Sequence, residues 1–200
     1  MFDSGIKVKE LIDELISEVD IALDIPQLTY IQWINSLQQI LYTEIIKEQK
    51  KTVLKSPLHS PIDISSIEVE NNENSPRFED IYAIYADNTQ LIKSTLTSGV
   101  IFPNTFYKDN NNIGFNTETA PTEFTIIYIV KPALITSDTI SSITVAVPIE
   151  FIDLVKAKLR GEAYKLANEG ELSAMWLNDY NILLETFKTW IAEKSSNFGI

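Results

Sequence analysis

Apolar residues near the start of the chain recur at intervals of three and four, with charged residues between them. This spacing places the apolar side chains along one side of an α-helix and the charges along the other. Pro26 interrupts the pattern, and Thr29 followed by Gln32 resembles a capping box that opens a second helix, which we expect to end near Lys50. The apolar positions of the first helix are Val8, Leu11, Ile12, Leu15, Ile16 and Val19.

The middle of the chain consists of short β-branched and aromatic segments separated by Asn, Asp, Ser, Gly and Pro. Residues 52–75 predict a loop that carries one weak strand. Two hairpins are predicted after it, one turning at Asp87 and Asn88 and one within residues 105–118, where Asn and Gly tolerate positive φ. The run 124–130 is continuously apolar, which predicts a central strand buried on both faces.

The helical pattern returns after Pro148, which stands where the first turn of a helix accepts proline. A third helix is predicted to end at Asn168 and Gly170, and a fourth begins at Glu171. The apolar stripe of the third helix contains Ile152, Val155, Leu159, Ala163 and Leu166, and that of the fourth contains Leu172, Trp176, Tyr180, Leu183, Phe187 and Trp190.

The order of these elements predicts an α+β fold. We expect an antiparallel-type helical bundle formed by the N- and C-terminal helix pairs, because each helix has an apolar face that it cannot bury alone. An inserted module of short antiparallel β-strands separates the two pairs. The chain is interpreted as one domain, 1–200, with helices at about 6–50 and 148–194 and the β-rich insert at about 52–147.

Composition and charge narrow the function. The formal net charge of −12 disfavours non-specific binding to nucleic acid, and we also expect no sequence-specific binding. An acidic surface is consistent with a passage through which DNA slides, and it is also consistent with a charge that serves solubility alone. The chain has no cysteine, which rules out disulfides, thiolate zinc sites and cysteine nucleophiles. We find neither a signal peptide nor the 18 to 20 consecutive apolar residues that span a bilayer, so we expect no membrane association.

Candidate catalytic residues are few. The single histidine, His59, lies in a segment rich in Ser and Pro, where it is either a general base or a solvated loop residue. The pairs Glu150 with Asp153 and Glu10 with Glu14 are either an acid and base or ordinary acids on helix surfaces. No glycine-rich phosphate loop is present, which disfavours nucleotide hydrolysis. Since one histidine cannot build a zinc site and the spacing of the carboxylates is that of ordinary surface acids, we expect no catalytic residue, no metal and no cofactor.

Large aromatic residues are concentrated in the predicted helices. Trp33 belongs to the second helix, whereas Trp176, Phe187 and Trp190 belong to the fourth. Aromatic side chains of this kind are enriched in cores and at protein interfaces. Both core packing and contacts between subunits therefore remain open for them.

Several segments of the sequence, in the order in which they occur, resemble those of one protein family. A second helix with Trp33 and Asn35 near its start is followed by a strand block, a hairpin, a strand closed by Pro132 and a helical end. Residues 6–194 thereby resemble the head-tail adaptor, or connector, proteins of tailed phages, particularly of short-tailed phages. The segments that carry the resemblance are TYIQWINSLQQILY, SPRFEDIYAIYADNTQLI, TFYKDNNNIGFN, FTIIYIVKP and VPIEFIDLVKAKLRGEAYKLANEGELSAMWLNDYNILLETF.

The resemblance implies a structural virion protein and not an enzyme. It implies a ring of copies, dodecameric to match the portal protein, that lies in the neck of the virion and joins the capsid to a tail or nozzle protein. Assembly would begin in the host cytoplasm. In such rings a C-terminal segment often reaches into the portal, so Asn197, Phe198 and Ile200 are predicted partner contacts, unless they form a disordered end.

Two other functions remain open. A tail-completion protein or another tail-associated binding protein could share this fold, and a hydrolase could use two carboxylates such as Glu150 and Asp153. Under the adaptor hypothesis, isolated subunits are monomeric or weakly associated and order their loops on meeting the portal. The long polar segment 51–77 motivates that expectation.

Overall fold

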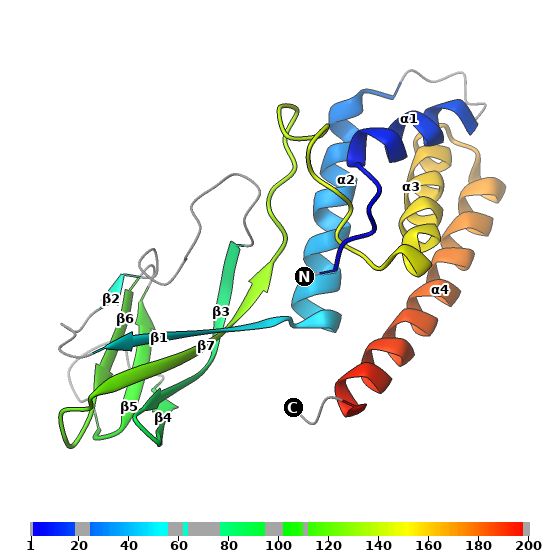
Figure 1. Ribbon diagram of the computed structural model, residues 1–200. Helices are drawn as coiled ribbons and strands as arrows, with labels where there is room; N and C mark the ends of the chain where they lie inside the picture. The colour runs from blue at the N-terminus through cyan, green and yellow to red at the C-terminus, as the bar shows by residue number, and fades with distance from the viewer. Residues whose placement is uncertain are drawn as a thin grey trace. The chain divides into compact units, whose positions relative to one another are not determined.

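The computed structural model of the protein describes residues 2–18, 25–55, 62–63, 77–94, 102–109 and 112–197. It is an α+β structure that divides into two compact units (Figure 1). Residues Met1–Ile46 and Pro132–Ile200 form the helical unit, and residues Lys47–Lys131 form the β unit. The β unit is therefore an insertion into the helical unit.

Four α-helices make up most of the helical unit, and their apolar residues join one core. Within this unit α3 lies between α2 and α4 (Figure 1). A π-helical turn extends α2, and a 3₁₀ turn after Pro148 leads into α3. The elements are α1 (Val8–Glu18), α2 (Gln27–Ile40), η1 (Leu41–Ile46), η3 (Ile149–Phe151), α3 (Ile152–Leu166) and α4 (Gly170–Asn197).

Helices α3 and α4 approach each other closely at Gly161. A Cβ atom at this position would lie 2.7 Å from two side-chain carbons of Leu177 and 3.3 Å from its backbone nitrogen. The Ser173 hydroxyl, which is buried, donates a hydrogen bond of 2.9 Å to the Gly161 carbonyl oxygen. The absence of a side chain at Gly161 thus lets the two helices pack at short range.

The segment between the β unit and α3 belongs to the helical core and not to the β-rich insert that we predicted at 52–147. Asn35 of α2 forms two hydrogen bonds with the backbone of Ile135, at 2.9 and 3.0 Å, in the manner of a neighbouring strand. Gln38, which is buried, accepts a bond of 2.7 Å from the Ala146 amide. The side-chain amides of Asn35 and Gln38 thus satisfy backbone groups of a segment without regular structure, so the apolar residues of that segment can be buried.

The predicted boundaries of the second helix are both wrong. Thr29 and Gln32 do not form its capping box, because α2 begins at Gln27 directly after Pro26 and has no side-chain cap. The helix also stops earlier than expected. The π-helical turn ends at Ile46, Lys47 adopts a positive φ of 48°, and the chain enters a strand at Gln49.

Seven described strands form the β unit in the order β1-β7-β3-β4-β5-β6-β2. The neighbours pair antiparallel, as predicted, except for β4 and β5, which are parallel. The strands are β1 (Gln49–Lys55), β2 (Ile62–Asp63), β3 (Arg77–Ala86), β4 (Thr89–Lys93), β5 (Thr105–Asp109), β6 (Asn112–Asn116) and β7 (Glu123–Lys131).

Both predicted hairpins are confirmed, as β3–β4 and β5–β6. The first hairpin turns at Asp87, whose φ is 49°. The Asp87 carboxylate accepts bonds from the Thr122 hydroxyl at 2.6 Å and from the amides of Thr122 and Glu123 at 3.0 and 3.1 Å. These hydrogen bonds hold the pKa of Asp87 below its usual value, and the bond from the Thr122 hydroxyl has the largest effect. The turn is thereby fixed to the start of β7.

Strand β7 is central, as predicted, and lies between β1 and β3. The prediction that both of its faces are buried is wrong within this chain, because burial alternates along the strand. Phe124, Ile126 and Tyr128 belong to the apolar core of the β unit. Ile127 and Ile129 point to the other face of the sheet and are partly exposed.

Candidate interaction surfaces

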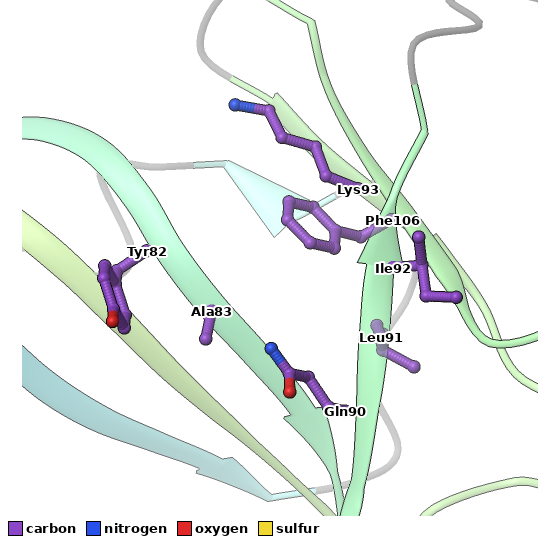
Figure 2. Close-up of a pocket in the computed structure, with 7 residues that line it drawn as sticks. All are labelled: Tyr82, Ala83, Gln90, Leu91, Ile92, Lys93 and Phe106. Carbon is purple, nitrogen blue, oxygen red and sulfur yellow. The ribbon is translucent and has the colours of Figure 1, made fainter.

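An open groove of about 390 Å³ lies in the β unit where strands β3 and β4 separate (Figure 2). The two strands pair at Ala86 with Thr89, at Tyr85 with Gln90 and at Ile84 with Leu91. Beyond these pairs β4 turns to β5 instead, through Ile92 and Lys93. The groove is lined by Tyr82, Ala83, Gln90, Leu91, Ile92, Lys93 and Phe106.

A β-bulge places Tyr82 at the groove. The register of β3 against β7 shifts between Ile81 and Ala83, so Tyr82 is the additional residue on the bulged strand. A bulge redirects side chains and increases the local twist. It leaves Tyr82 59% exposed, and Ile92, which also lines the groove, is 71% exposed and is the most exposed large apolar residue described. Two large apolar side chains therefore border the groove without being covered.

The groove is lined by both apolar and polar side chains. Its floor contains the buried residues Leu91 and Phe106, and its polar groups are those of Tyr82, Gln90 and Lys93. Lys93 lies 3.6 Å from the carboxylate of Asp80, outside the lining. No carboxylate is among the lining residues, so the groove gives no support to hydrolysis by two carboxylates.

A second candidate surface lies on α4. Met175 and Ile182 are 48% and 59% exposed, and they are seven residues apart, which places them on one side of the helix. Leu172 and the partly exposed Asp179 extend the same line at spacings of three and four. We call Leu172, Met175, Asp179 and Ile182 the outward row. Met175 and Ile182 lie roughly opposite the buried Phe187 and Ile191, so α4 has apolar side chains on both sides.

The helical aromatic residues pack within the helical unit. The Trp33 ring contacts that of Tyr30 edge-on at 5.4 Å. Trp190 lies 5.6 Å from Phe2, and it also contacts Phe151 and the fully buried Phe187. These contacts are those of core packing. The sequence pattern left core packing and contacts between subunits open for the aromatic residues, and the exposed large apolar residues of α4 are Leu172, Met175 and Ile182.

Trp176 and Trp190 each make a cation–π contact. Lys194 lies 5.2 Å from the centre of the Trp190 ring, and the Arg160 guanidinium of α3 lies 4.6 Å from the centre of the Trp176 ring. Arg160 also forms an ion pair with Glu18 of α1, and Lys156 forms one with Glu14. Arg160 therefore joins three helices.

The described residues considered for catalysis, Glu10, Glu14, Glu150 and Asp153, lie at exposed or partly exposed positions. His59 lies outside the described residues. Glu150 and Asp153 are exposed at the start of the last two-helix segment, and no described group of three or more acids and histidines could hold a metal ion. Burial raises the pKa of Tyr30 and of Tyr180, and the Glu44 carboxylate raises that of Tyr180 further. Both hydroxyls thus stay neutral near pH 7.

The predicted partner contacts at the C-terminus lie at the limit of the described chain. Asn197 is the last residue of α4, and Phe198 and Ile200 lie outside the described residues. In the part of the chain that the structure describes, no helix is long and apolar enough to cross a bilayer.

No protein-family model matches this sequence, and a comparison with curated proteins gives no match. The resemblance to phage adaptors therefore stays a prediction from the sequence.

Proposed function

We propose that this chain is a structural virion protein, the head-tail adaptor that docks beneath a phage portal and links the capsid to the tail. One observation carries the proposal. Helix α4 buries one side in the core of the helical unit and still exposes the outward row, in which Met175 and Ile182 are about half accessible. Apolar side chains that line up on a surface mark protein contacts.

Identical neighbours are the partners that we propose for this row. In a ring every copy has the same environment, so a single surface repeated around the ring covers all the exposed rows together. The ring would be dodecameric to match the portal, would occupy the neck of the virion and would assemble in the host cytoplasm. Residues Asn197, Phe198 and Ile200, which follow the row along the same chain, would contact the portal.

The finer architecture is also a proposal. All four helices contribute to one apolar core, which supports a bundle formed by the N- and C-terminal pairs. A helical bundle of this kind suits a subunit that would hold the tail in a fixed position relative to the portal. The β unit, with its own core and its open groove, would then offer a separate surface to a tail or nozzle protein.

Electron microscopy of the chain mixed with its portal tests the proposal. We expect the wild-type protein to decorate the portal ring. Ile182→Lys places a charge in the outward row and should leave the portal bare or incompletely covered. Asn181→Lys is the matched control, because Asn181 is also exposed but lies about 100° round the helix from Ile182.

Two results would contradict parts of this proposal. If the wild-type chain left the portal bare, the adaptor function would be wrong, and a tail-associated protein would become the better hypothesis. If the purified chain formed complete rings without portal, the expectation that subunits order on meeting the portal would be wrong.

A further inference from the structure

One face of the sheet in the β unit, the face away from its apolar core, carries exposed and partly exposed side chains of the described strands β1 and β7. Along β1 the residues Lys51, Val53 and Lys55 alternate with Leu54, which packs against the apolar core of the unit. They therefore point to the opposite face. On that face β7 contributes Ile127, directly opposite Lys51 in the register, and Ile129. We call Lys51, Val53, Lys55, Ile127 and Ile129 the outer sheet face.

This face is apolar at its centre and basic at its edge. Val53 is 45% exposed, and Ile127 and Ile129 are partly exposed. Within the described residues neither Lys51 nor Lys55 forms an ion pair. Lys55 has Glu123 opposite it in the register, whereas Lys51 has an isoleucine, so Lys51 is the cation with no facing carboxylate.

The basic character is local. The segment Lys47–Lys55 contains four lysines and one acid, in a chain with 28 acidic and 16 basic residues. Lysines on an edge strand protect against aggregation between edges, and this is their usual role. That role does not explain the three aliphatic residues beside them, and it does not explain why a central strand is apolar on both sides.

The outward row of α4 has the complementary composition. It combines the aliphatic residues Met175 and Ile182 with Asp179 between them, and Asp179 forms no ion pair with a described residue. Leu172 and the exposed Glu171 extend the row. The helical unit as a whole has 17 acidic and 8 basic residues. Its charge therefore attracts a basic face.

The two surfaces also match in length. From Lys51 to Lys55 the strand spans about 14 Å at a rise of about 3.4 Å per residue. From Leu172 to Ile182 the helix spans about 15 Å at a rise of about 1.5 Å per residue. A helix laid on the sheet could thus place Met175 and Ile182 against the aliphatic strip and Asp179 near Lys51.

We propose that the outer sheet face of one copy binds the outward row of α4 of a second copy. Charge attraction of this kind selects the partner and its register, while the aliphatic contact excludes water. Because the two surfaces differ, the contact is heterologous, so each copy can bind two neighbours and the contact can repeat until a ring closes. The inference rests on the proposed function, because the proposed adaptor ring requires a contact that repeats between neighbouring copies.

Disulfide trapping tests this contact, and the chain suits it because it contains no cysteine. Val53→Cys and Ile182→Cys are made separately, mixed and oxidised by dissolved oxygen with copper–phenanthroline, so that two thiols lose two protons and two electrons to oxygen. We expect the mixture to give several-fold more disulfide dimer than either variant alone. A mixture of Val53→Cys with Asn181→Cys is the matched control and should stay at the background yield.

The doubly substituted chain decides which copy supplies the helix. We expect Val53→Cys with Ile182→Cys to give ladders of linked chains. A crosslink within one monomer would overturn the inference, since the chain's own α4 would then cover the face. A mixed yield equal to that of the Asn181→Cys control would also overturn it.

Charge exchange provides an independent measurement. Lys51→Glu should weaken self-association, measured by sedimentation velocity, by about tenfold, and mixing it with Asp179→Lys should restore the association. Failure of the mixture to recover would contradict the proposed pairing. Portal decoration separates the two hypotheses. If the chains crosslink but do not bind the portal, the contact between copies is supported and the adaptor function is wrong. If the chains bind the portal but do not crosslink, the adaptor function is supported and the contact is wrong.

Discussion

Substitution of Gly161 by alanine tests whether close packing of α3 and α4 stabilises the helical unit. Two effects of opposite sign compete. Alanine favours a helix over glycine by about 1 kcal/mol. Against this, the new Cβ would lie 2.7 Å from the Leu177 side chain and 3.3 Å from its backbone nitrogen. Overpacking of this kind costs about 1–3 kcal/mol. We expect a net loss of about 1 kcal/mol, because the side chain can rotate away and the backbone cannot.

The sign of the effect should depend on Leu177. In a Leu177→Ala background the contact with the side-chain carbons disappears, and Gly161→Ala should then be neutral or stabilising by up to about 1 kcal/mol. The coupling between the two positions in a double-mutant cycle is the quantity that matters. Gly170→Ala is the matched control, because no atom lies within 4 Å of a Cβ placed there.

Urea denaturation followed by tryptophan fluorescence is the appropriate assay. The three tryptophans, Trp33, Trp176 and Trp190, all belong to the helical unit, so their emission reports on that unit alone. An unchanged m-value would show that the shift in midpoint reflects stability. If Gly161→Ala were as stable as the wild type and remained so without the leucine side chain, the reasoning from close approach would be refuted.

Two further predictions concern polar contacts. Gln38→Leu should destabilise the helical unit by about 1–3 kcal/mol, because it leaves the buried Ala146 amide without its acceptor. Tryptophan fluorescence in urea measures this, with the exposed Gln39→Leu as control, and equal stability of the two variants would contradict it. Asp87 has a lowered pKa in the fold, so its contribution to stability is complete above the pKa of an unfolded aspartate, about 4, and is lost as the pH falls through the lower folded value. The Thr122 amide resonance should titrate below pH 4 and lose that transition in Asp87→Asn, and a midpoint at 4 or above would be inconsistent with this account.

Helices could be predicted from this sequence where one face is continuous. The spacing in α1, α3 and α4 predicts each helix and much of its buried side. Leu172 is an exception, because it belongs to the predicted apolar stripe of α4 and is 40% exposed. The boundaries of α2 could not be predicted in the same way. Its start depends on Pro26 and its end on a π-helical turn, and neither has a periodic signal.

Long-range hydrogen bonds explain the misplaced boundary of the insert. Residues 132–148 contain Pro, Ser and Thr in a loop-like pattern, and they become core only because Asn35 and Gln38 satisfy their backbone. Such pairs are 100 and 108 residues apart in sequence. No local rule identifies them.

The groove was missed although the sequence carries a trace of it. Phe78, Ile81 and Ile84 contribute to the core of the β unit, and they are three residues apart, whereas an uninterrupted strand would bury every second residue. Each interval of three contains one register shift, and the second shift exposes Tyr82. A spacing of three inside an evident strand could therefore have indicated the bulges. The predicted contacts Phe198 and Ile200 lie outside the described residues and gain no structural support.

The pairing of β1 with β7 makes the two units separable by genetic means. The chain enters the β unit just before Gln49 and leaves it just after Ile129, and these two residues face each other across the sheet. Paired Cα atoms are about 5 Å apart. A short turn could bridge that distance, so the β unit could be excised or grafted between related helical scaffolds without opening the helical core. Exchange of the coding segment for the β unit between genomes could therefore change which partner the β unit binds and leave the helical unit unchanged.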